Sequence, residues 1–152
     1  MMPFWTILHG ILAMALIGAS THQGLAIWRR PRPAGVFVDR FRAVPPARFA
    51  NAIACLYVVT WTLGAFIYPT YVLDVKGAVA DYGMRNTVGL FQLKEHCSVL
   101  GLVLVPVYLH FWRTVPLTEG VQARRFLTTC MMVLAWFSLV VGHILNNLKG
   151  LQ

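Results

Sequence analysis

Long apolar stretches alternate with short polar segments along the whole chain. Four of them, at about residues 3–28, 49–68, 91–112 and 126–148, reach the length of about 20 apolar residues that a helix needs to cross a membrane. The connections after the first and third stretches are short, which favours antiparallel neighbours. We therefore predict an all-α fold in a single domain, residues 1–152, that forms an integral membrane up-down four-helix bundle.

Composition agrees with a membrane protein. Of the 152 residues, 58% are hydrophobic and only 12% are charged, whereas about 25% are charged in a soluble domain. The N-terminal stretch has no basic segment before it, and its apolar run continues past the small residues into Gly24–Leu25. We therefore expect a retained first transmembrane helix rather than a signal peptide.

The basic residues indicate topology rather than a nucleic-acid partner. Nine of the 13 lysines and arginines lie in the first connection, residues 29–48, and the third, residues 113–125. The positive-inside rule places these two connections in the cytoplasm and both termini on the outer, periplasmic side. The expected partner is membrane lipid, and the expected location is a bacterial inner membrane. Nucleic acid is not expected.

Five histidines lie within the predicted helices and none lies in a connection. The helical rise places His9, His96 and His143 at one depth near the outer surface, and His22 and His110 at a second depth about 20 Å further in. Ionisable residues inside a membrane are costly, so a functional role is the default hypothesis for them.

Pairs of histidines at equal depth on parallel helices are the arrangement that bis-histidine ligation of haem b requires. The first and third helices run in the same direction, so His9 pairs with His96 and His22 with His110 as ligands of the haem iron. This predicts one or two haems. In an ideal helix, however, His22 lies about 140° away from the face of His9. His143 is an alternative iron ligand in place of His9 or His96, or a partner for a haem propionate or a quinone oxygen.

The spacings of 13 residues between His9 and His22 and of 14 between His96 and His110 resemble those of a known family. In the cytochrome b subunit of the quinol–cytochrome c oxidoreductases, histidines on two parallel helices of a four-helix bundle hold two b haems. Small di-haem four-helix cytochromes that relay electrons between quinone and a soluble protein are similar in size. The resemblance implies haem b, electron transfer and quinone as a possible second cofactor.

Two further groups of residues are candidates for chemistry. Glu95, beside Lys94 and His96, is a possible proton acceptor next to a quinol pocket; the alternative is a charged pair at a helix entrance. The cysteines have no CxxC spacing and are expected to be small buried hydrophobes, although Cys97 adjoins His96 and could contribute to a metal site. They are Cys55, Cys97 and Cys130.

We therefore interpret the chain as a membrane b-type cytochrome, an electron-transfer subunit of a membrane redox complex that passes electrons between quinone and a partner redox protein. Two other classes of function stay open. One is a cofactor-free accessory subunit that stabilises a larger membrane complex. The other is a transporter that uses the histidines as a proton relay.

Overall fold

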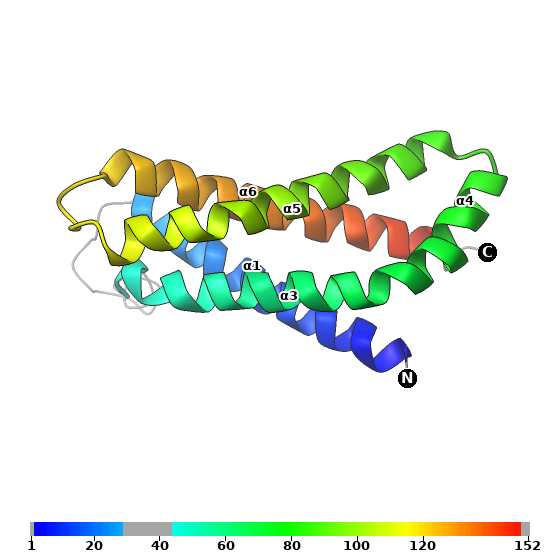
Figure 1. Cartoon of the computed structure of the whole chain (residues 1–152), viewed down its shortest axis with the longest axis horizontal. Helices are drawn as coiled ribbons and strands as arrows, with labels where there is room; N and C mark the ends of the chain where they lie inside the picture. Colours follow the sequence, from blue (N-terminus) through cyan, green and yellow to red (C-terminus); the bar gives the residue numbers. More distant parts are fainter. Residues whose placement is uncertain (1, 29–43, 150–152) are drawn as a thin grey trace, which may run out of the picture.

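The computed structural model describes residues 2–28 and 44–149, and it is an all-α bundle (Figure 1). Each of the long helices is apolar enough to cross a membrane, so the predicted fold class is confirmed. They are α1 (Met2–Trp28), α3 (Ala50–Tyr71), α5 (Arg85–Arg113) and α6 (Val121–Lys149). Short elements are the 3-10 helix η1 (Pro46–Phe49), the π-helix η2 (Val72–Lys76) and α4 (Gly77–Asp81).

The long helices form a ring around a main hydrophobic core, and a smaller cluster of Phe91, Val141 and Leu145 lies nearer the end where α1 begins. Helix α1 packs against α3 and α6, and α5 packs against the same two helices, so α1 and α5 are diagonal neighbours. We call the end with Trp28, Trp112 and residues 114–120 the closed end, and the end where α1 begins and α6 finishes the open end. Figure 1 shows α1 and α5 drawing apart toward the open end.

The helix boundaries differ from the expected ones mainly around Pro69. The sequence predicts that the second helix stops at Tyr68, but α3 continues through Pro69 to Tyr71 and leads directly into η2. Proline has no N–H to donate, yet α3 continues past it and the π-helix begins three residues later, at Val72. The expected connection at residues 70–90 is therefore largely helical.

Helices α5 and α6 begin earlier than expected, because polar residues extend both at their N-terminal ends. Helix α5 starts at Arg85 rather than at residue 91, and α6 starts at Val121 rather than at residue 126. Most of the predicted first connection, residues 29–43, lies outside the described part of the chain.

A hydrogen bond between diagonal helices fixes the closed half of the core. The hydroxyl of Tyr108 on α5 donates to Oε1 of Gln23 on α1 over 2.7 Å, and Nε2 of Gln23 donates to the Pro46 carbonyl over 3.0 Å. Both side chains are fully buried. A buried polar group is costly unless it is paired, so this chain of bonds ties α1, α5 and η1 into one arrangement.

Two tryptophans at the closed end make the same set of contacts with α6. Each indole N–H donates to a threonine, and each ring lies under an arginine. The two sets are Trp112 with Thr128 and Arg124, and Trp28 with Thr129 and Arg125. Trp28 is 58% exposed, whereas Trp112 is 5% exposed and belongs to the core.

Arg124 holds the connection between α5 and α6. Its side chain is only 3% exposed, and its guanidinium donates to five backbone carbonyls. The acceptors are Phe111, Val115, Pro116, Leu117 and Glu119. A guanidinium is suited to this role because it carries five N–H donors in a fixed plane. The buried charge is therefore solvated by the backbone of residues 111–119.

Replacing Arg124 by lysine should destabilise the fold, because an ammonium has three donors and cannot reach the same carbonyls. We expect Arg124→Lys to lower the free energy of unfolding by about 3 kcal/mol, the loss of one to two hydrogen bonds from a charged donor. Denaturant titration in detergent micelles measures it. Arg85→Lys, at an exposed position, is the matched control, and equal effects of the two substitutions would contradict the role of Arg124.

Candidate functional site

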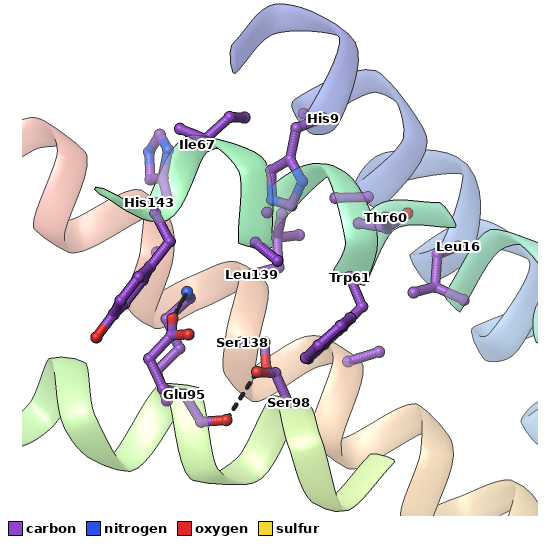
Figure 2. Close-up of a pocket in the computed structure, with 18 of the residues that line it drawn as sticks. His9, Leu16, Thr60, Trp61, Ile67, Glu95, Ser98, Ser138, Leu139 and His143 are labelled. Carbon is purple, nitrogen blue, oxygen red and sulfur yellow. Dashed lines mark hydrogen bonds and ion pairs between the residues drawn. The ribbon is translucent and has the colours of Figure 1, made fainter. Parts of the chain in front are cut away.

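The open half of the bundle contains a cavity of about 520 Å³ that all four long helices line (Figure 2). Its volume lies within the range of about 300–1,000 Å³ that is usual for small-molecule sites. The wall is mostly apolar, and Gly10 leaves room where a larger residue would fill it. A Cβ placed on Gly10 would meet no atom within 4 Å. The polar residues that line the cavity are Thr6, His9, Thr60, Lys94, Glu95, Ser98, Ser138 and His143.

His9 reaches from α1 into this cavity, as Figure 2 shows. Its ring rests on α3, where an ideal Cβ on Gly64 would lie 3.1 Å from the His9 Cε1 atom. The backbone of Thr60 is close enough to interact with the imidazole. The Nδ1 atom is nevertheless buried with no hydrogen-bond partner among the described residues. Such a buried acceptor or donor is rare, and it is often explained by a bound group.

The charged residues of the cavity come from α5, and the second histidine comes from α6. Lys94 Nζ donates to Glu95 Oε1 over 2.6 Å, and the pair is about a quarter to a third exposed, with side-chain values of 23% and 34%. Lys94 also reaches toward α6, since an ideal Cβ on Gly142 would lie 3.6 Å from the Lys94 Cε atom. His143 follows Gly142 and lines the same cavity (Figure 2).

An aromatic stack forms one wall near the open end. The ring of Phe91 on α5 is nearly parallel to those of Tyr71 and Tyr68 on α3, at centroid distances of 4.8 and 5.9 Å. The Lys94 ammonium lies 5.4 Å from the Phe91 centroid. Flat apolar walls with one cationic group nearby suit a planar ligand that carries an acidic substituent.

His96 lies outside the cavity. Its side chain is exposed on α5, and Nδ1 lies 2.7 Å from the Gln92 carbonyl oxygen of its own helix. Lys94, Glu95 and Ser98 are the residues of this turn that line the cavity. The sequence predicts that His96 pairs with His9, and the structure does not bring these two side chains together. His143 lines the cavity instead. The sequence leaves this alternative open, because the helical rise places His143 at the same depth as His9 and His96.

The inner pair of histidines is not brought together either. His22 is buried, with its ring 4.5 Å from that of Phe49, while His110 is exposed beside Phe111 on the outer face of α5. The bond between Gln23 and Tyr108 occupies the core at this depth. This outcome follows the angle of about 140° between His9 and His22 in a straight helix.

The cysteines do not add a metal site. All three are free, and Cys55 is exposed rather than buried as expected. Within residues 2–28 and 44–149, no three His, Cys, Asp or Glu side chains are grouped so as to hold a bare metal ion. This result does not bear on haem, because the porphyrin supplies four ligands of the iron and the protein supplies at most two.

Sequence reasoning missed Tyr57, which closes the cavity toward the core. Its hydroxyl donates to the Ser98 carbonyl over 3.3 Å, and its ring packs directly against Gly101, where a Cβ would collide with it. A glycine opposite a large aromatic residue is the signal of such close helix packing, but it needs knowledge of which helices are neighbours.

Comparison of the chain with known protein families, with characterised proteins and with solved structures gives no match. The chemistry of the cavity residues is thus the basis on which a function has to be argued.

The packing of Tyr57 on Gly101 gives a direct test of the cavity floor. We expect Gly101→Ala to lower the free energy of unfolding by about 1–3 kcal/mol, because the added methyl group displaces a buried ring. Gly89→Ala on the same helix, where a Cβ meets nothing within 4 Å, should instead be neutral or stabilising. Denaturant titration of both variants checks this, and a neutral Gly101→Ala would show that the helices do not approach so closely.

Proposed function

We propose that this integral membrane protein is a b-type cytochrome, an electron-transfer subunit whose haem b lies in the open-end cavity with His9 and His143 as the iron ligands. The observation that carries the proposal is the pair of histidines from two different helices at one mostly apolar cavity of suitable volume. The family resemblance in the sequence has the same implication, although it rests on other histidine pairs.

The residues of the cavity fit this cofactor in three respects. The buried Nδ1 atom of His9 lacks a hydrogen-bond partner among the described residues. The Thr60 backbone beside the imidazole is the type of neighbour that orients a metal-ligating histidine. Third, Gly10 lines the cavity and has no atom within 4 Å of an ideal Cβ, so a flat macrocycle could come close to the α1 backbone there.

Lys94 and Glu95 give the cavity a polar rim. The Lys94 ammonium is placed to pair with an acidic substituent of the ligand, as it now pairs with Glu95. Release of Glu95 from Lys94 would leave a carboxylate that accepts the proton of a bound quinol. The apolar remainder of the wall excludes water, which lowers the local dielectric constant and thereby influences the reduction potential.

A bound haem supplies one-electron chemistry, and a haem in the open-end cavity would lie near one end of the membrane-spanning helices. We propose that electrons pass there between quinone and a partner redox protein of a membrane complex. From the arginine distribution we further propose a bacterial inner membrane, with the open end on the periplasmic side and the closed end at the cytoplasm. The proposal includes one haem, because His22 is buried whereas His110 is exposed on the outer face of α5.

Substitution of single histidines tests the ligand assignment. We expect His9→Ala and His143→Ala each to remove or strongly reduce the α-band of a b haem in a reduced-minus-oxidised spectrum of purified protein, because each removes an iron ligand. His96→Ala and His110→Ala are matched controls on exposed positions and should retain the band. Loss of the band in His96→Ala with retention in His143→Ala would contradict the assignment.

The same spectrum separates the other classes of function. A cofactor-free accessory subunit or a histidine-relay transporter would show no α-band in the unmodified protein, even when it is expressed with an ample supply of haem. Absence of the band would therefore refute the cytochrome proposal as a whole.

A further inference from the structure

The closed end of the bundle carries two arginines whose charge the fold does not neutralise. Arg48 is exposed in η1, just before α3, and Arg113 is exposed as the last residue of α5. In the part of the chain that the structure describes, neither guanidinium pairs with a carboxylate. Arg124 differs from both, because backbone carbonyls solvate its buried charge. Two unpaired cations at one corner of the bundle favour an anionic partner.

Asn51 holds the Arg113 side chain beside the start of α3. Nε of Arg113 donates to Oδ1 of Asn51 over 2.6 Å, and Figure 1 shows the start of α3 next to the end of α5. This bond orients the guanidinium and leaves the N–H groups of both Nη atoms for another acceptor. Asn51 follows Arg48 by three residues, so their side chains are neighbours on one helical face. Arg48, Asn51 and Arg113 therefore form one group of donors, which we call the arginine corner.

Two membrane-spanning helices end at the arginine corner. The span of α3 begins at Pro46 and the span of α5 ends at Arg113, so the corner lies at the depth of the lipid headgroups. Further into the bilayer, Val58 of α3 and Pro106 of α5 are exposed and apolar. They lie seven residues from Asn51 and from Arg113, which is about two helical turns and therefore the same face. A ligand that matches this surface has an anionic group at one end and apolar chains at the other.

We propose that the arginine corner binds the phosphate group of an anionic phospholipid, whose acyl chains lie along the exposed face of α3 and α5. A guanidinium suits this role because its planar N–H groups match the oxygens of a phosphate. A lipid with net negative charge is preferred over a zwitterionic one, because the ammonium group of a zwitterionic headgroup offsets the phosphate charge. The site uses no residue of the cavity, so the proposal does not depend on the haem.

Quenching by brominated lipids measures which lipid occupies the site. The exposed Cys55 lies four residues after Asn51, so it can carry a fluorescent label in a background in which the other two cysteines are replaced by alanine. In bilayers, brominated phosphatidylglycerol should quench this label at lower mole fractions than brominated phosphatidylcholine. Arg48→Gln and Arg113→Gln should each reduce the preference about fivefold, the usual contribution of one arginine near an anionic membrane surface. Equal quenching of the unsubstituted protein by both lipids overturns the proposal.

Substitutions that keep the charge separate a built site from general attraction to the membrane surface. Asn51→Leu and Arg113→Lys should each weaken the preference for phosphatidylglycerol by about twofold or more, because the guanidinium loses its orientation or its planar donors. Arg85→Gln, at an exposed position of α5 in the open half, is the matched control and should leave the preference unchanged.

Two results of these measurements would contradict the site. Unaltered preference in both Asn51→Leu and Arg113→Lys would show that charge alone attracts the lipid. Relief of quenching by excess inorganic phosphate would show that the acyl chains contribute nothing and that the ligand is a free anion. The haem spectrum reads out the cavity separately, so failure of either proposal is recognised independently of the other.

Discussion

The hydrogen bond between Tyr108 and Gln23 is the constraint on which the rest of the bundle depends. It joins the two helices that are diagonal neighbours, α1 and α5, and it is fully buried. Two helices joined at one depth can separate only away from that point. At the closed end, Arg124 and the two tryptophan contacts fix α6 against the same helices. The cavity lies in the open half, away from these contacts.

These contacts have particular weight in a membrane. Lipid chains are as apolar as leucine, so the hydrophobic effect contributes little to the association of helices, and close packing and hydrogen bonds become decisive. The closed half has both, in the Tyr108–Gln23 bond and in residues packed as closely as Gly24 is to Met132, whose Sδ atom would lie 2.7 Å from an added Cβ. The open half contains a smaller cluster of Phe91, Val141 and Leu145 beside the cavity. A planar group bound in the cavity would fill the space that these side chains leave.

The sequence allowed the fold to be predicted because membrane helices are defined by length and apolarity. The four long helices and their approximate positions follow from that rule. The rule does not predict where each helix ends: α3 continues through Pro69 into the π-helix η2, and polar residues extend α5 back to Arg85. The position of each histidine along its helix could also be predicted from the sequence, since the helical rise is constant.

The direction in which each histidine faces was much harder to predict. Depth gives His9, His96 and His143 equal rank, but only two of these lie at the cavity. Their selection depends on how α5 and α6 are rotated about their own axes, which is set by contacts such as Tyr57 on Gly101 between helices far apart in sequence. The angle of about 140° between His9 and His22 did predict that the two side chains lie on different faces of α1. In the structure the His22 ring packs against Phe49.

The central claim is that the bundle holds a single redox group, in its open half. The most direct measurement is the ratio of haem b to protein in the purified membrane protein, from the pyridine haemochrome spectrum and quantitative amino-acid analysis. One haem per chain is the predicted result. A ratio of two would require a second site at the depth of His22 and His110, where Tyr108 and Gln23 occupy the core, and a ratio of zero would leave the cavity without its proposed ligand.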